Sequence, residues 1–430
     1  MILIKNITLI TQNLQRQIIK RGGLVIEKDK IKDIGLSGRL ERKYSRLAKK
    51  IIDGRGKVAL PGLINTHGHL AMTLLRGYTD DISLEDWWFK YVYPVESRFT
   101  AKHVYWGSLL AMLEMIKSGT TCFTDFYYYQ DQVAKAAQEI GMRGVLGCAI
   151  LDVPTFRFKN STTALKIAQS AIKKYQNNDL LEVTLAPHMF QTTFLKTYQK
   201  CKKLTKENDL LLTTHLAETK QEVDYCLKKY KGRPIEVLAK AGILDQRTIL
   251  AHGCWLSKKE IEILAQSGAS IAHCPISNMK LASGVMPLAE MLKAGVNLAL
   301  GTDSACSNNN LDMFGEMKTA ALLHKVHQLN PTVADAQTVL DMATLNGAKA
   351  LGLAKEIGSL VAGKKADLII LDFNQPHLLP HHNFVSHLVY ASKGSDVETV
   401  IINGKIVMEG RKIKRVKENR VLDRIKKFAL

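Results

Sequence analysis

The sequence lacks the features of a secreted or membrane protein. Its seven cysteines are an odd number, are scattered and include no C-x-x-C pair, which argues against a disulfide framework and against a cysteine zinc site. No apolar run approaches the roughly 20 residues of a membrane span. The opening stretch MILIKNITLI, interrupted by Lys5 and Asn6, does not resemble a secretory signal. We therefore expect a cytoplasmic protein with no membrane partner.

Acidic residues are scarce relative to basic ones. The chain has 40 Asp and Glu against 60 Lys and Arg, a formal net charge of +20. Basic charge invites a nucleic-acid-binding interpretation, but the lysines and arginines are spread along the chain and no recognition motif accompanies them. We interpret the charge as a solvated basic surface and expect no nucleic-acid partner. The sequence leaves open whether the chain forms a homo-oligomer.

The chain is long enough for a large barrel with an appendage. It has 430 residues, 46% hydrophobic and 23% charged, which is a globular composition. The pattern of the first 60 residues and of the last 70 predicts short strands separated by turns that contain glycine. We predict that residues 1–59 and 358–430 together form a small β-sandwich domain, and that residues 60–357 form a second, larger domain.

The larger domain alternates short apolar runs with segments of helical period, such as residues 101–119 and 132–141. Eight strand–helix units in sequence predict an α/β fold, a (β/α)8 barrel of the TIM type. The eight apolar runs span residues 60–69, 119–128, 142–151, 180–190, 210–219, 248–255, 269–277 and 296–305.

Polar side chains recur where these runs end. They are His67, His69, Asp125, Asp152, His188, His215, His252, His273 and Asp303. The chemistry of a (β/α)8 barrel lies at the C-terminal ends of its strands, so these residues are candidate ligands or catalytic groups. For Asp125 and His273 a structural hydrogen-bonding role is an equally good interpretation.

Four of these residues form a plausible metal site. His67, His69, His215 and Asp303 offer imidazoles and a carboxylate, a ligand set that suits Zn²⁺ first and Fe²⁺ second. The alternative is that each is a hydrogen-bonded core residue, which becomes less plausible for several residues at the same edge. Related barrel hydrolases with two metals use a lysine at the end of strand 4. Residues 180–190 contain no lysine, so we expect one divalent metal ion.

A carboxylate follows the third histidine of this set. Glu218 lies three residues after His215 in the stretch HLAE, and it can approach the same pocket without binding the metal. A carboxylate beside metal-activated water can transfer protons. The alternative interpretation is a glutamate in a surface loop.

Several longer stretches resemble a known family. They are PGLINTHGHLAMTLLRGYTDD, HLAET, LAHGCWL, GSLVAGKKADLIILD and the long segment of residues 273–317. The chain resembles the amidohydrolase superfamily along nearly its whole length. Within it, the chain is similar to the 5′-methylthioadenosine/S-adenosylhomocysteine deaminases.

The resemblance implies roles for individual residues. It implies the same four metal ligands, a proton-transfer role for Glu218, and a role for His252 in orienting the attacking hydroxide. Asp303 would bind the metal and also accept a proton from water. Glu96 and His188 match positions that contact substrate, and Glu96 suits a ribose diol because a carboxylate can accept two hydroxyl hydrogen bonds.

The chain departs from the family pattern in its substrate pocket. It reads APHMFQTT after strand 4 where the family commonly has APHSPYT, and TDSACSNNN where the family often has TDGAASNNN. Of the substrate-binding arginines that the family has after strand 3, this chain offers only Arg157. Met189 and Phe190 either line the pocket for a thioether tail or belong to the core.

Hydrolytic deamination of 5′-methylthioadenosine, S-adenosylhomocysteine or both is the expected reaction. It would release ammonia and leave an inosine-type product, with a purine nucleoside as the small-molecule partner. One alternative is an aminohydrolase or chlorohydrolase acting on guanine, an oxidised purine or a triazine, which would have no ribose for Glu96 to hold. A cyclic amidase is disfavoured by the missing strand-4 lysine. A metal-free binding protein is disfavoured by the intact ligand set.

Overall fold

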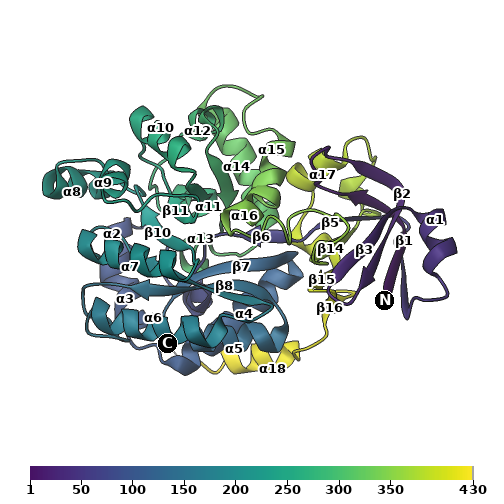
Figure 1. Ribbon diagram of the computed structural model, residues 1–430, viewed down its shortest axis with the longest axis horizontal. Coiled ribbons are helices and arrows are strands. Elements are labelled where there is room, and N and C mark those ends of the chain that lie inside the picture. The colour runs from purple at the N-terminus through teal and green to yellow at the C-terminus, as the bar shows by residue number, and fades with distance from the viewer. Residues whose placement is uncertain (429–430) are drawn as a thin grey trace.

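A nearly closed barrel of parallel strands forms the larger part of the molecule (Figure 1). The structure, a computed structural model, describes residues 1–428 except for the side chain of Glu85. The barrel strands are β6 (Leu63–Asn65), β7 (Thr120–Tyr127), β8 (Arg143–Ile150), β9 (Leu181–Pro187), β10 (Leu212–Leu216), β11 (Thr248–His252), β12 (Ser270–His273) and β13 (Asn297–Leu300). Each lies inside one of the eight apolar runs, so the predicted (β/α)8 fold is confirmed.

The first and last barrel strands meet just below the candidate metal ligands. The Thr66 N–H donates to the Leu300 carbonyl over 3.0 Å, and the Asp303 N–H donates to the His67 carbonyl over 3.0 Å. This approach depends on Gly301, because a Cβ there would lie 2.8 Å from the Cβ of His67. The residues that close the barrel therefore also place His67 beside Asp303.

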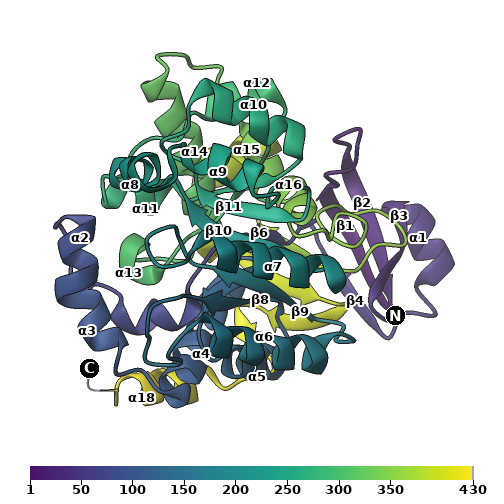
Figure 2. The same ribbon diagram turned by 60° about the vertical axis from the view of Figure 1, so that its left-hand side comes forward.

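Helices surround the barrel in both views (Figures 1 and 2). Those that follow strands β7 to β13 are α5 (Gln130–Ile140), α6 (Ser161–Tyr175), α7 (Leu195–Glu207), α8 (Lys220–Tyr230), α9 (Pro234–Lys240), α10 (Lys258–Ser267), α11 (Pro275–Lys280), α12 (Leu288–Ala294), α13 (Ala305–Asn308), α14 (Met313–His327), α15 (Ala336–Met342) and α16 (Leu345–Ala350). Within residues 1–428, no helix combines the length and the apolar character that a membrane crossing requires.

The connection between β6 and β7 is long and mostly helical. It contains η1 (Leu70–Leu75), α2 (Leu84–Asp86), the π-helix η2 (Trp87–Val92), α3 (Tyr93–Glu96) and α4 (Ala101–Lys117). Trp87 and Trp88 lie in this connection, in the π-helix before Glu96. Residues 84–96 are helical, with Pro94 in the first turn of α3, where a missing N–H costs nothing.

Strands from both ends of the chain form one mixed sheet beside the barrel. They are β1 (Ile2–Ile10), β2 (Ile18–Glu27), β3 (Lys30–Leu36), β4 (Lys50–Asp53), β5 (Lys57–Pro61), β14 (Leu368–Asp372), β15 (Val397–Ile402), β16 (Lys405–Glu409) and β17 (Lys412–Ile413), with helix α1 (Ser37–Tyr44) beside β1 and β2. The two ends meet where β5 pairs antiparallel with β14. Figure 1 shows the first strands and the last strands side by side.

The last segments of the chain join the sheet to the barrel. These segments also contain η3 (Pro376–Leu378), α17 (Phe384–Tyr390), η4 (Gly394–Asp396) and α18 (Glu418–Ile425). Helix α18 packs against α4 of the barrel, where Lys117 and Glu418 form an ion pair of 2.9 Å. A buried bidentate pair joins Arg143 of β8 to Asp367 just before β14, with N–O distances of 2.6 and 3.2 Å. The division into two domains stays a prediction, and these contacts are where its two parts meet.

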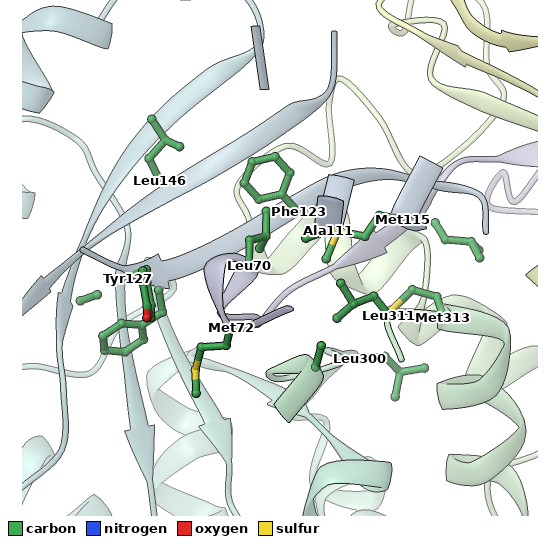
Figure 3. Packing of buried hydrophobic residues seen from close by; sticks show 14 of the residues in the cluster. Leu70, Met72, Ala111, Met115, Phe123, Tyr127, Leu146, Leu300, Leu311 and Met313 are labelled. Atoms are coloured by element: carbon green, nitrogen blue, oxygen red, sulfur yellow. The ribbon is translucent and has the colours of Figure 1, made fainter. Parts of the chain in front are cut away.

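The main hydrophobic core lies between the barrel and its helices. Figure 3 shows part of this core. The labelled side chains come from η1, α4, β7, β8, β13, α14 and the chain leading into α14: Leu70, Met72, Ala111, Met115, Phe123, Tyr127, Leu146, Leu300, Leu311 and Met313. Because η1 begins directly after His69, burial of Leu70 and Met72 fixes the backbone that carries this histidine.

Candidate active site

The structure brings the four predicted metal ligands together at the C-terminal ends of the barrel strands. His67 and His69 follow β6, His215 belongs to β10, and Asp303 follows β13. The Nε2 atom of His69 lies 3.3 Å from Asp303 Oδ1, and that of His67 lies 3.6 Å from the same oxygen. The Nε2 atoms of His69 and His215 are 3.2 Å apart. Residues far apart in the sequence thus converge on one point.

Backbone carbonyls set the orientation of two of these imidazoles. The Nδ1–H of His69 donates to the Phe126 carbonyl over 2.6 Å, and the Nδ1–H of His215 donates to the His188 carbonyl over 3.2 Å. In each ring the Nε2 atom then faces the other members of the cluster. Second interactions of this kind orient the histidine ligands of metal sites.

His67 provides an independent test of whether a metal ion fits. Both of its ring nitrogens are buried and have no hydrogen-bond partner within the described residues. A buried polar atom without a partner is costly, so an ion at the centre would satisfy an otherwise unexplained lone pair. Burial also lowers the pKa of His67 and His215 well below the usual value, which keeps both imidazoles neutral and able to bind a metal. The site fits a divalent ion.

Asp303 presents one oxygen to the cluster and is held by the other. Its Oδ2 accepts hydrogen bonds from the Ser277 hydroxyl at 2.5 Å and the Ser307 hydroxyl at 3.0 Å. Burial acts to raise the pKa of Asp303, but the bond to His69 and the neighbouring imidazoles outweigh it and hold this pKa well below its ordinary value. The carboxylate is therefore ionised and fixed in orientation.

Backbone strain is concentrated at this centre. His252 has φ of 75° and Asp303 has φ of 59°. Non-glycine residues rarely adopt the left-handed region, and such strain persists only where the surrounding structure enforces it. Both residues end or directly follow barrel strands, so the strain turns their side chains toward the cluster.

His252 and Glu218 complete the cluster on one side. One ring nitrogen of His252 lies within 4.8 Å of one ring nitrogen each of His67 and His215. Its Nε2 is 3.7 Å from Glu218 Oε2, and its Nδ1 accepts a hydrogen bond of 3.0 Å from the Asn278 amide. Glu218 Oε1 accepts from the Ser283 hydroxyl at 3.1 Å. His252 Nε2 is thus a donor directed toward the centre, with a carboxylate beside it.

Glu96 is a buried carboxyl group with unused hydrogen-bonding capacity. It is 1% exposed, its Oε1 accepts from the Tyr127 hydroxyl at 2.5 Å, and its Oε2 is buried without a partner among the described residues. Burial raises the pKa of Glu96 to about 7, against the opposing effects of Tyr127 and His69. The Tyr127 ring also lies beside His69, with centroids 6.5 Å apart. Glu96 is therefore poised beside the cluster to accept further hydrogen bonds.

Of the two other residues expected to contact substrate, the structure brings only one to the cluster. The His188 ring packs edge-on against His215 with centroids 5.0 Å apart, and burial lowers its pKa to about 3. Arg157 instead places its guanidinium carbon 4.3 Å from the centroid of the Tyr129 ring. There it lines a groove between α5 and α6, a cavity of about 260 Å³.

Three further strand-end residues have structural contacts. Asp125 accepts from the Leu70 N–H at 2.8 Å and so holds the turn after His69. Asp152 accepts from the Ser161 and Thr197 hydroxyls and from the Phe194 N–H, which joins the loop after β8 to α6 and α7. His273 hydrogen-bonds to His324 of α14, with Nε2 atoms 3.0 Å apart.

The altered segment after β9 places its two large apolar residues differently. Phe190 is fully buried and packs against Tyr198 and Tyr230, with ring centroids 5.5 and 5.3 Å apart. Of the two interpretations left open for Phe190, the structure supports the core residue, because the ring is buried among these aromatic side chains. Met189 is half-buried.

Sequence reasoning missed several residues that support the site. Ser277 and Ser307 hold Asp303, Asn278 holds His252, and Ser283 holds Glu218. Three of these contacts join residues at least 26 positions apart, so nothing in the local sequence marks them, whereas Ser307 lies only four residues after Asp303. Glu222 carried a readable signal, since it stands three residues after Thr219 in a capping pattern.

A (β/α)8 barrel that collects imidazoles and a carboxylate at its strand ends is the architecture of a metal-dependent hydrolase. The comparison with known families agrees, since the model of the amidohydrolase family matches residues 58–407. The chain belongs to the amidohydrolase family.

Named relatives and solved structures support the same class. The chain is 47% identical to a 5-methylthioadenosine/S-adenosylhomocysteine deaminase of Thermococcus sibiricus, covering 91% of this chain and 90% of the relative. It is 42% identical to a 5′-deoxyadenosine deaminase of Methanosarcina mazei, covering 100% and 97%. A zinc-bound adenosine deaminase of Xanthomonas campestris superposes with a TM-score of 0.97 at 32% identity, covering 99% and 97%. The predicted enzyme class, a metal-dependent aminohydrolase, and the predicted divalent metal are confirmed.

Proposed function

We propose that this enzyme hydrolytically deaminates adenosines that are modified at C5′. The substrates are 5′-methylthioadenosine and S-adenosylhomocysteine. We add 5′-deoxyadenosine because two relatives at 42% identity are named 5′-deoxyadenosine deaminases. The observation that carries the proposal is the unpartnered, buried Oε2 of Glu96 beside the imidazole cluster. A carboxylate in that position accepts the two hydroxyls of a ribose.

The metal ligands in this proposal are His67, His69, His215 and Asp303, and the ion is Zn²⁺. Three nitrogen ligands and one carboxylate suit zinc, with Fe²⁺ as the alternative. The zinc-bound neighbour of known structure favours zinc. When bound, the ion supplies a hydroxide nucleophile at neutral pH by lowering the pKa of water.

The residues around this centre divide the proton transfers between them. His252 donates a hydrogen bond from Nε2 that aims the nucleophilic oxygen at C6 of the adenine ring. Glu218 delivers a proton to N1, so that negative charge does not accumulate on the ring during addition, and it takes up the proton of the new C6 hydroxyl when the product carbonyl forms. Asp303 accepts the proton lost by water and returns it to the leaving amino group, which departs as ammonia. Assistance of this kind contributes typically about 10²–10⁴-fold to a rate.

The other substrate contacts follow from the same geometry. His188, kept neutral by burial, can hydrogen-bond to the purine without adding charge. Arg157 is the cation expected to meet the carboxylate of S-adenosylhomocysteine, but its described contact is with Tyr129. We therefore place S-adenosylhomocysteine below 5′-methylthioadenosine and 5′-deoxyadenosine in substrate preference, since its charged tail would lack that partner.

We also propose that the enzyme works in the cytoplasm. All seven cysteines are free and buried. Unpaired thiols in this number are typical of a reducing compartment. Cell fractionation with an antibody against the chain tests this location.

The substrate proposal is tested by ammonia release from a panel of compounds. The panel contains 5′-methylthioadenosine, 5′-deoxyadenosine, S-adenosylhomocysteine, adenosine, adenine, guanine and a triazine. We expect the nucleosides to be deaminated and adenine to be a poor substrate. Activity confined to guanine or the triazine would overturn the proposal, and a preference for S-adenosylhomocysteine would contradict only the order of substrates.

A further inference from the structure

The turn between β10 and α8 is strained and carries Glu218. Ala217 has φ of 48°, in the left-handed region. Alanine rarely adopts this conformation, so contacts around the turn must enforce it. One contact is the Trp255 N–H, which donates to the Ala217 carbonyl over 3.0 Å. The turn reverses the chain after His215 and brings Glu218 back toward His252.

Glu222 contacts this turn from inside helix α8. Its Oε2 accepts the backbone N–H of Glu218 at 3.1 Å, and the N–H of Ala217 also favours its ionised form. The side chain is 3% exposed, and its Oε1 is buried without a partner among the described residues. A buried carboxyl group at this point costs desolvation energy, and it contacts the backbone of the residue proposed to move protons.

Two neighbouring helices show that this arrangement differs from ordinary capping. In α9 Glu236 accepts the N–H of Arg233, the N-cap residue, at 3.2 Å. In α10 Glu260 accepts the N–H of its N-cap Ser257 at 2.9 Å. Glu222 holds the same third position of its helix, after the N-cap Thr219. Glu222, however, accepts its hydrogen bond from the N–H of Glu218, one residue before the N-cap.

We propose that Glu222 is a positioning residue for the deamination, holding the turn so that the Glu218 carboxylate faces His252 and the substrate ring. The proposal rests on the proton-transfer role proposed for Glu218. That carboxylate is then fixed at both ends, because Glu222 holds its backbone and Ser283 holds its Oε1. A proton donor must be placed within a fraction of an ångström to act in the transition state.

A double-mutant cycle with Glu218 tests this role. We expect Glu222→Ala to lower kcat for 5′-methylthioadenosine by about 10–100-fold, the cost of misplacing a reacting group by roughly 1 Å. KM and metal content should change little. In the Glu218→Gln background the same substitution should have no further effect on kcat, because the group that it positions is already gone. Equal losses in both backgrounds would overturn the proposal.

Conservative variants separate positioning from folding. Burial raises the pKa of Glu222 to about 8, so Glu222→Gln mimics the neutral acid, can still accept the Glu218 N–H and should retain most of kcat. If Glu222→Ala does not fold, Glu222→Asp takes its place in the test. It keeps a carboxylate but shortens its reach toward the Glu218 N–H, so the same loss of kcat is expected. Glu236→Ala is the matched control, since it removes a capping bond of the same kind from α9 and should leave kcat unchanged.

A crystal structure of Glu222→Ala distinguishes this proposal from the function on which it rests. We expect the Glu218 carboxylate to leave its place 3.7 Å from His252 Nε2. An unchanged carboxylate would overturn the positioning role whatever the substrate is. A displaced carboxylate in an enzyme that deaminates none of the nucleosides would refute the proposed function and leave the positioning of Glu218 standing.

Discussion

Replacement of Glu96 by alanine should separate nucleosides from free bases as substrates. Hydrogen bonds to a charged group contribute about 1.5–3 kcal/mol each. Two ribose hydroxyls on the Glu96 carboxylate therefore contribute about 3–6 kcal/mol, or roughly 10²–10⁴-fold in kcat/KM. We expect Glu96→Ala to lower kcat/KM for adenosine by that factor. Its effect on adenine should be small, because the base has no hydroxyls for Glu96 to bind.

The assay pairs the protein variant with a matching change in the substrate. Ammonia release is measured for adenosine and 2′,3′-dideoxyadenosine with the wild-type enzyme and with Glu96→Ala. The wild-type enzyme should strongly prefer adenosine, because a site built for hydroxyls leaves its polar groups unpaired with the dideoxy analogue. In the variant the two substrates should become nearly equal.

The neighbouring tyrosine provides the control for this experiment. Tyr127→Phe removes the hydroxyl that donates to Glu96 Oε1 at 2.5 Å but leaves the carboxylate in place. It should keep the preference for adenosine. If the preference for adenosine over its dideoxy analogue survives in Glu96→Ala, the assignment of Glu96 to the ribose is refuted.

Three further predictions concern pH, the metal and stability. Because burial raises the pKa of Glu96 to about 7, kcat/KM for adenosine should fall as the pH drops below about 7 and the carboxylate takes up a proton; Glu96→Gln should remove this dependence from the pH profile. Elemental analysis should find close to one Zn²⁺ or Fe²⁺ per chain, and His215→Ala should lose metal and activity together. Asp367→Ala leaves the buried Arg143 charge without its ion-pair partner and should lower the free energy of unfolding by about 3–5 kcal/mol in urea titrations.

Each of these three predictions has a result that would contradict it. A flat pH profile for the wild-type enzyme between pH 5 and 8 would show that Glu96 stays ionised throughout. Two ions per chain, or an unaltered metal content in His215→Ala, would contradict the ligand set. For stability the control is Glu27→Ala, which removes an exposed pair with Lys32 and should cost less than about 1 kcal/mol. Equal costs for the two variants would contradict the special role of Asp367.

The barrel could be predicted from sequence because its strands are buried on both faces. Each apolar run between residues 60 and 305 contains one observed strand, since a strand covered by helices outside and packed inside must be apolar along its length. The segment 84–96 could not be predicted in the same way. Its helices form around buried contacts of Trp87 and Val92 with the core, and tertiary packing overrides a weak local signal.

The metal ligands could also be proposed from sequence, because barrel topology places strand ends at one edge. His67 and Asp303 are separated by more than 200 residues, yet the order of strands alone makes them neighbours. No rule of topology predicts the hydrogen bonds that orient these groups. Ser277 reaches Asp303, and Asn278 reaches His252, only because the chain after β12 turns across the barrel mouth.

The sequence by itself determined the type of fold, the residues that can hold a metal ion, and the carboxylate that follows His215. These depend on periodicity and on the topology of a repeated strand–helix unit, which are local or nearly local properties. Only the tertiary structure decided where long side chains point. It placed Phe190 in the core, Arg157 on Tyr129 and Glu222 under the turn that carries Glu218. The physical reason is that a side chain's direction depends on which distant surfaces it meets, and packing fixes these only after the barrel has closed.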